Sequence, residues 1–203
     1  MTSPTLLWLR RDLRLSDHPA LNRALARGGA VIPVFVLDPV FEGFGAAPLW
    51  WLGESLADLS RRLEAKGSRL ILRRGEALSV LSGLAKETGA GGVIWSRLYD
   101  PASIERDKAV QEGLRARGLE AESVNGSLLF EPWTVETGSG GFYKVYTPFW
   151  KAVRGRDVDA PSPEPGRIPA PDAWPASDAV ADWRLGARMD RGAAVVARHA
   201  NVG

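Results

Sequence analysis

Cysteine is absent from this 203-residue sequence, and histidine occurs only at positions 18 and 199. Without cysteine the chain forms no disulfide, thiolate nucleophile or iron–sulfur cluster, and two distant histidines do not indicate a transition-metal site. No apolar run approaches the roughly 20 residues that a membrane-spanning helix needs, and the N-terminus lacks a secretory signal pattern. The sequence therefore predicts a cytoplasmic protein with no metal site and no membrane contact.

A strong charge of one sign is also missing, because the formal net charge is only +2. Such a small excess does not by itself indicate nucleic-acid binding, which depends on a concentrated basic patch. The P-loop motif and the nucleophile elbow G-x-S-x-G do not occur, and "GFGAAP" at 43–48, the nearest match to a dinucleotide fingerprint, does not directly follow a strand. These absences argue against the common nucleotide-binding and hydrolase classes.

The first 125 residues do contain short apolar runs rich in strand-forming residues, at 5–9, 31–37, 69–72, 92–95 and 119–124. Runs of this kind are typical of strands buried on both faces. Helical patterns separate them, and the clearest is a stripe of leucines spaced three and four residues apart: Leu49, Leu52, Leu56, Leu59 and Leu63. The alternation predicts an α/β fold, a doubly wound parallel five-stranded sheet (Rossmann-like) with helices on both faces.

Particular residues mark where these helices begin and end. Pro48 suits the first turn of the leucine helix, and Gly67 suits its C-terminal cap. Asp17 is a candidate N-cap for the helix that follows the first strand. Asp100 before Pro101 predicts a helix that extends to about residue 117.

The residues just beyond the strands are candidates for ligand binding, because ligands of doubly wound sheets sit outside the carboxyl ends of the strands. Those we single out are Arg10, Asp12, Asp38, Trp95, Arg97 and Tyr99. The aromatic and guanidinium groups offer a flat wall for a planar ligand, and the carboxylates offer hydrogen-bond acceptors. The alternative is structural, with Trp95 in the core and Arg10 and Asp12 in ion pairs. No catalytic constellation stands out.

After residue 125 the pattern changes to the glycine-rich stretch "TGSGGFYKVYTPFW" and then to a proline-rich linker with prolines at 161, 163, 165, 169, 171 and 175. Such proline spacing is typical of a stiff, extended segment. The last residues begin a helical pattern and then stop. Two interpretations stay open: the chain is a fragment of a longer protein, or the tail folds back on the α/β domain as an arm.

Five segments occur in the order and spacing found in the N-terminal half of DNA photolyases and cryptochromes: "LLWLRRDLRLSDHPAL", "VIPVFVLDP", "VIWSRLYDPASIERDKAV", "LLFEPWTV" and "FYKVYTPFWK". They cover about residues 5–151, and the chain resembles the antenna-binding α/β domain of that family. The resemblance implies a light-harvesting chromophore (a folate, a deazaflavin or a flavin) at the strand ends. It also implies FAD in a C-terminal helical domain that binds DNA containing pyrimidine dimers and flips the dimer out.

We therefore interpret the chain as the N-terminal domain of a deoxyribodipyrimidine photolyase, a light-driven DNA-repair lyase, and expect it to be monomeric and inactive alone. The alternatives are a cryptochrome-like blue-light photoreceptor and a free-standing flavin- or nucleotide-binding module. The predicted organisation is the antenna-binding domain at 1–130, a glycine-rich segment and helix closing it at 131–155, the linker at 156–181 and the start of the FAD domain at 182–203. Whether the natural protein continues past Gly203 stays open.

The six candidate residues match family motifs position by position, and Arg106 with Asp107 matches a family pair that we expect to make ion pairs to neighbouring loops. The antenna type stays open. Ala102 and Ser103 stand where folate-type relatives have Asn-Glu, and Leu98 stands where deazaflavin-type relatives have aspartate.

Overall fold

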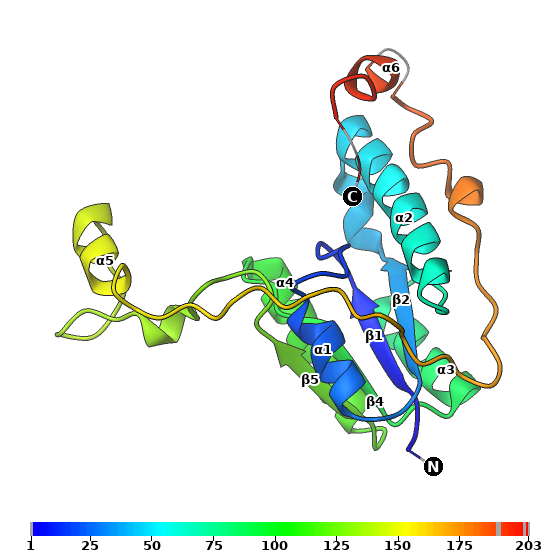
Figure 1. Cartoon of the computed structure of the whole chain (residues 1–203), viewed down its shortest axis with the longest axis horizontal. Coiled ribbons are helices and arrows are strands. Elements are labelled where there is room, and N and C mark those ends of the chain that lie inside the picture. The colour runs from blue at the N-terminus through cyan, green and yellow to red at the C-terminus, as the bar shows by residue number, and fades with distance from the viewer. Residues whose placement is uncertain (1, 190–191, 201, 203) are drawn as a thin grey trace.

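The computed structural model describes residues 2–189, 192–200 and 202. Its centre is a five-stranded sheet in the order β3-β2-β1-β4-β5, with every neighbouring pair of strands parallel (Figure 1). The strands are β1 (Thr5–Leu9), β2 (Val31–Leu37), β3 (Ile71–Arg74), β4 (Gly92–Ser96) and β5 (Glu120–Val124). This confirms the predicted doubly wound α/β fold.

Helices cover both faces of the sheet. On one face lie α1 (Pro19–Ala26) and α2 (Ala46–Ala65), and on the other lie α3 (Ala77–Thr88) and α4 (Pro101–Arg115). Along β1 the side chains alternate between the two layers: Leu6 and Trp8 pack with α3 and α4, whereas Leu7 and Leu9 pack with α1 and α2. Because both faces are buried, the strands read in the sequence as continuous apolar runs.

The helix ends agree with the sequence except at α1. Gly67 follows α2 with φ +74°, and the Asp100 side chain accepts a hydrogen bond from the Ser103 N–H at 3.0 Å. The cap of α1 is His18 rather than the predicted Asp17, since His18 Nδ1 accepts from the Leu21 N–H at 3.2 Å. Asp17 has φ +46° and instead binds the linker residue Ser162.

The proline-rich linker folds back along the α/β body. Ile168 is fully buried among α1 and α2 residues, and its N–H donates to the Lys66 carbonyl at 3.1 Å. Further along, the Asp178 N–H donates to the Leu72 carbonyl at 2.9 Å, which covers the free edge of β3. Short helices η3 (Val180–Trp183) and α6 (Ala193–Val196) follow. The linker is therefore part of the packed structure.

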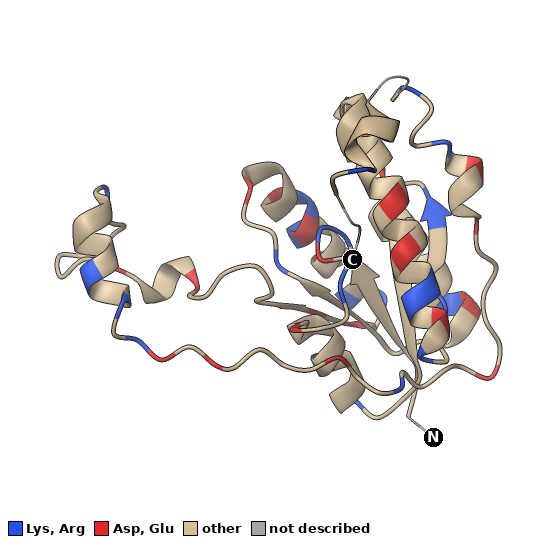
Figure 2. Ribbon diagram, turned by 45° about the horizontal axis from the view of Figure 1, so that its top comes forward, with Lys and Arg blue, Asp and Glu red and all other residues tan. Residues whose placement is uncertain are grey.

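Residues 127–158, here called the arm, extend away from the sheet and contain η2 (Pro132–Thr134) and α5 (Tyr146–Val153) (Figure 1). The segment predicted to close the domain, 131–155, lies within this arm, and its first residue, Glu131, pairs with Arg97 at the end of β4. Figure 2 shows acidic and basic residues interspersed along α2 and α4. Within the described residues no helix has the length and apolar character to cross a membrane.

Candidate ligand site at the strand ends

Arg10 fills the sheet edge between the ends of β1 and β4, where the strand order reverses. Its side chain is 6% exposed, and Nη1 lies 2.6 and 2.7 Å from the two carboxylate oxygens of Asp107 on α4. Nη2 donates to the Ser96 carbonyl, and the guanidinium lies 4.5 Å from the centre of the Trp8 ring. Burial lowers the pKa of Arg10, and the Asp107 charge opposes that shift. Arg10 therefore joins β1, β4 and α4.

Arg106 continues this network toward β2. Its Nη2 lies 3.1 Å from Asp107 Oδ1, and its Nη1 lies 3.3 Å from Asp38 Oδ2. Asp38 follows β2 directly and also caps η1 (Pro39–Gly43), where its Oδ1 accepts from the Val40 N–H at 2.8 Å. The ion pairs expected for Arg106 and Asp107 are present. The row Arg10–Asp107–Arg106–Asp38 ties the ends of β1 and β2 to α4.

Asp12 and His18 form a second buried contact behind Arg10. Asp12 Oδ1 accepts from the Arg10 N–H at 2.9 Å, and its Oδ2 lies 3.2 Å from His18 Nε2. Because His18 Nδ1 accepts the capping hydrogen bond, the neutral ring carries its proton on Nε2, facing Asp12. Burial lowers the pKa of His18, and Asp12 opposes that shift. This pair shapes the loop between β1 and α1.

The other three candidates lie at the ends of β4 and β5. Trp95 is 1% exposed, and its ring centre lies 5.7 Å from that of Trp8. Arg97 is paired with Glu131, donates to the Ser123 carbonyl at 2.8 Å and lies over the Trp133 ring. The Tyr99 hydroxyl donates to Glu131 at 2.9 Å, and burial followed by Glu131 raises the pKa of Tyr99 to about 12. Arg97 and Tyr99 therefore tie the base of the arm to the sheet.

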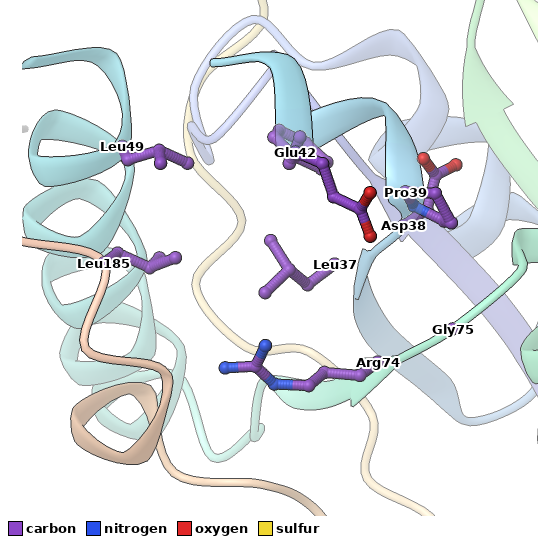
Figure 3. Close-up of a pocket in the computed structure, with 9 residues that line it drawn as sticks. Leu37, Asp38, Pro39, Glu42, Leu49, Arg74, Gly75 and Leu185 are labelled. Atoms are coloured by element: carbon purple, nitrogen blue, oxygen red, sulfur yellow. The ribbon is translucent and has the colours of Figure 1, made fainter. Parts of the chain in front are cut away.

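Two pockets flank the Arg10 network. The β4–β5 pocket, of about 260 Å³, is lined by Trp95, Arg97, Leu98, Tyr99, Ile104, Asp107, Lys108, Gln111, Ser123 and Trp133. The β2–β3 pocket, of about 340 Å³, is lined by Leu37, Asp38, Pro39, Phe41, Glu42, Leu49, Arg74, Gly75 and Leu185 (Figure 3). The candidates are thus split, with Asp38 in one pocket, Trp95, Arg97 and Tyr99 in the other, and Arg10 and Asp12 lining neither.

The β2–β3 pocket has mostly apolar walls and two charged side chains, Arg74 and Glu42, without ion-pair partners among the described residues. In Figure 3, Arg74 reaches from the end of β3 beneath Leu37 toward α2, and Glu42 descends from η1 above Leu37. Within the described part of the chain neither Arg74 nor Glu42 forms an ion pair, whereas Asp38 is paired with Arg106. A mostly apolar hollow with a few convergent polar groups is typical of a small-molecule site.

Sequence reasoning missed Arg74 because the third strand was predicted at 69–72. The strand is Ile71–Arg74, so Arg74 ends it and lies at the sheet edge where ligands of such folds bind. Leu185 was missed for a different reason, since it lies over one hundred residues along the chain from the other lining residues and reaches the pocket only because the linker folds back. A strand end placed two residues later points to Arg74, whereas no local signal points to Leu185.

Comparison with known proteins identifies relatives that match most of this chain. A family model described as DNA photolyase matches residues 5–166. A deoxyribodipyrimidine photo-lyase of Agrobacterium fabrum is 46% identical over 185 residues, which are 91% of this chain and 39% of that protein. Cryptochrome-2 of Arabidopsis thaliana is 39% identical over 173 residues, 83% of this chain and 28% of that protein.

Among solved structures, a bacterial class III photolyase from Agrobacterium tumefaciens matches with a TM-score of 0.87 at 46% identity, covering 91% of this chain and 39% of that one. The chain therefore spans about two fifths of that photolyase and less than a third of the plant cryptochrome.

Proposed function

The chain belongs to the DNA photolyase family, and from that premise we propose that it is the N-terminal antenna-binding domain of a photolyase that repairs pyrimidine dimers in cytoplasmic DNA. In this proposal the chain holds a light-harvesting chromophore. FAD and DNA are bound by the additional polypeptide that relatives carry, so the chain alone performs no repair.

The β2–β3 pocket is the observation that carries the antenna assignment. It lies beyond the carboxyl ends of two parallel strands, where α/β sheets bind ligands, and its lining is apolar except for a few charged groups. These residues fit a planar chromophore, which absorbs light and passes excitation energy onward when bound. Leu37, Phe41 and Leu49 would exclude water from its ring system, and Asp38 would hold the pocket wall through Arg106.

The remaining candidates support the pocket from outside in this proposal. Arg10 and Asp12 fix the loop after β1, and Trp95 packs behind Arg10 with Trp8. Arg97 and Tyr99 hold Glu131 at the base of the arm. We therefore assign Arg10, Asp12 and Trp95 a positioning role, and the β4–β5 pocket is the competing location for the chromophore.

Filling each pocket separately tests the location. Leu37→Trp adds an indole to the β2–β3 pocket, and Ile104→Trp adds one to the β4–β5 pocket. After reconstitution with a folate, a deazaflavin or FMN, we expect an absorption band above the tryptophan range in the parent chain and the Ile104→Trp variant, and its loss in Leu37→Trp. If the absorption band is lost only in the Ile104→Trp variant, the chromophore binds in the β4–β5 pocket instead.

A cryptochrome-like photoreceptor is the second candidate, because plant cryptochromes also match the chain. Light-dependent repair of dimer-containing DNA by the full-length gene product separates the two. We expect repair that requires light; absence of repair by an FAD-loaded protein would favour the receptor. Repair of dimers by the 203-residue chain alone would contradict the proposal that FAD and DNA are bound by additional polypeptide.

A further inference from the structure

The arm holds most of the large apolar side chains that the chain leaves in solvent. Among the described residues thirteen large hydrophobic side chains are exposed, and nine of them lie in the arm. Single apolar residues are scattered over the surface of any soluble protein, whereas a contiguous patch of them marks an interaction site. Since the arm extends away from the sheet (Figure 1), the α/β body does not cover this patch.

These side chains line one groove, here called the arm groove, of about 700 Å³. On α5 the lining residues are Tyr146, Phe149, Trp150 and Val153, which share one face of the helix because they are spaced three and four residues apart. The Tyr146 and Trp150 rings are nearly parallel, with centres 6.4 Å apart and planes inclined by 6°. Much of the remaining lining comes from 127–135, so the groove is formed within the arm.

The charged side chains that line the arm groove are both positive. They are Arg154 and Arg156, and neither forms an ion pair with a carboxylate of the described residues. Arg156 is held in place without being neutralised: its Nη1 donates to the Thr134 carbonyl at 3.0 Å, and its guanidinium lies 4.5 Å from the centre of the Phe130 ring. The groove is therefore apolar inside and positive at its rim.

A polar hollow of about 1050 Å³ adjoins the groove and reaches the α/β body. The two share residues 127–130 as a common wall, and Arg11, Arg14 and Asp17 line the hollow from the loop between β1 and α1. Arg14 donates to the carbonyls of Asp17 and Gly126, each at 2.8 Å. An apolar centre rich in aromatic residues beside a polar, charged surface is the anatomy of a protein–protein interface.

We propose that the arm groove receives an amphipathic helix of the additional polypeptide that relatives carry, and that carboxylates beside the apolar stripe of that helix pair with Arg154 and Arg156. The inference rests on the proposed function and adds the surface on which the FAD-holding polypeptide packs. This chain covers 39% of the Agrobacterium fabrum photolyase, so that relative has ample polypeptide to supply a helix. Helices bind such grooves through apolar anchors spaced three and four residues apart, and the unpaired arginines select acidic flanks.

Charge also argues against two other occupants. A second copy of the arm would bring two more arginines to the same groove, and like charges placed together weaken association. An anionic lipid surface would meet the carboxylates of Asp17, Asp157 and Asp159 in the adjoining hollow. A helix with its own carboxylates beside an apolar stripe meets the positive rim without either conflict.

Trypsin cleavage after Lys144 measures whether the arm is covered, because this residue is exposed just before α5. The rate is compared between the 203-residue chain and the full-length gene product at equal concentration. We expect cleavage to be at least about tenfold slower in the full-length product, since cleavage then requires the docked arm to open. Cleavage after Arg117, in the exposed turn that follows α4, is the internal control and should proceed equally in both.

Substitutions in the full-length product separate the apolar contact from the charged one. Trp150→Asp places a carboxylate in the groove and should return the cleavage rate after Lys144 to that of the isolated chain. Arg154→Glu should raise the rate at least about threefold by reversing a rim charge, and added salt should raise the rate of the parent. Trp51→Asp, at an exposed tryptophan of α2 outside the groove, is the matched control and should change nothing. Trp150→Asp should also leave the urea unfolding of the isolated chain unchanged, which shows that the variant folds.

Each outcome supports or overturns the inference. Equal cleavage of the isolated chain and of a full-length product that repairs dimers in light would overturn the inference and leave the proposed function standing. Protection that survives Trp150→Asp or Arg154→Glu would also overturn it. Protection of the isolated chain that grows with its concentration would assign the groove to a second copy, and protection by anionic vesicles would assign it to a membrane. A gene product that ends at residue 203 would contradict the proposed function and the inference together. Protection lost in Trp150→Asp and Arg154→Glu and kept in Trp51→Asp supports the inference.

Discussion

The α/β body and the arm contain the same kinds of large apolar side chain and place them in opposite environments. Trp8 and Trp95 in the sheet are each 1% exposed, whereas Phe142 and Tyr146 in the arm are 75% and 70% exposed. The body buries its side chains because each strand lies between two helical layers. The arm has no second layer within the described structure, so the same residue types stay in solvent.

This difference shows that residue type alone does not determine burial in this chain. Leu56, Leu59 and Leu63 in the leucine stripe of α2 are buried because the sheet lies beneath them. The apolar face of α5 lines a groove formed only with other residues of the arm, and Val153 is its one buried residue. Stability should therefore reside in the body, and changes in the arm should affect solubility and surface hydrophobicity instead.

The buried ion pair of the body should give the largest effect. Asp107→Ala leaves Arg10 charged, 6% exposed and without its main partner, so we expect a loss of about 3–5 kcal/mol in the free energy of unfolding. Urea denaturation measures it. Glu122→Ala, which breaks the exposed pair with Arg23, should cost less than about 1 kcal/mol. Similar losses from both changes would show that burial does not set the strength of these pairs.

A matched pair of leucines compares the two regions directly. Leu59 on α2 is 1% exposed and Leu129 in the arm is 74% exposed. Leu59→Ala should lower the free energy of unfolding by about 2–5 kcal/mol, because it leaves a cavity in the core. Leu129→Ala should change it by less than about 0.5 kcal/mol. A loss above about 1 kcal/mol for Leu129→Ala would mean that the arm is packed in solution.

The pH dependence of the free energy of unfolding should be governed in part by the titration of His18. Burial lowers the His18 pKa in the folded state, so below about pH 6.5 the unfolded chain binds a proton that the folded chain excludes. Stability is therefore complete above that pH and falls as the pH decreases, by at most about 1.4 kcal/mol per pH unit from this group. His18→Asn keeps a capping acceptor and removes the titration. Denaturation from pH 5 to 7.5 should show a shallower slope for the variant, and identical slopes would exclude His18 as the cause.

Much of the body was predictable because its signals are local and agree with one another. The apolar run of β2 and the leucine spacing of α2 each require a buried face, and alternation of such elements specifies the parallel sheet. The cap of α1 was misplaced by one residue because Asp17 and His18 both offer acceptors, and only the tertiary contact of Asp17 with Ser162 decides between them.

The candidate site was predictable only in part. Asp38 is predicted by the rule that ligands bind beyond strand ends. The same rule also points to Arg74 once the third strand is taken to end at residue 74 instead of 72. Sequence alone does not show that Arg10 forms a buried ion pair with Asp107, because the two residues are 97 positions apart in the chain. Leu185 and Trp183 reach the site because the linker before them folds back along the α/β body. The proline spacing predicts that this linker is stiff, but it does not indicate which surface the linker packs against.

The smallest effect on stability should come from the arm itself. Phe142→Ser together with Tyr146→Ser removes two of its most exposed rings and should leave the free energy of unfolding within about 0.5 kcal/mol of the parent. The same change should reduce binding of a hydrophobic dye and raise the concentration at which the chain self-associates, because these rings form part of a contiguous apolar groove with Leu129 and Trp150. Thr137→Ser, an exchange in the same arm that removes no ring, is the control. Unchanged dye binding in the double variant would show that the arm's apolar side chains are covered in solution.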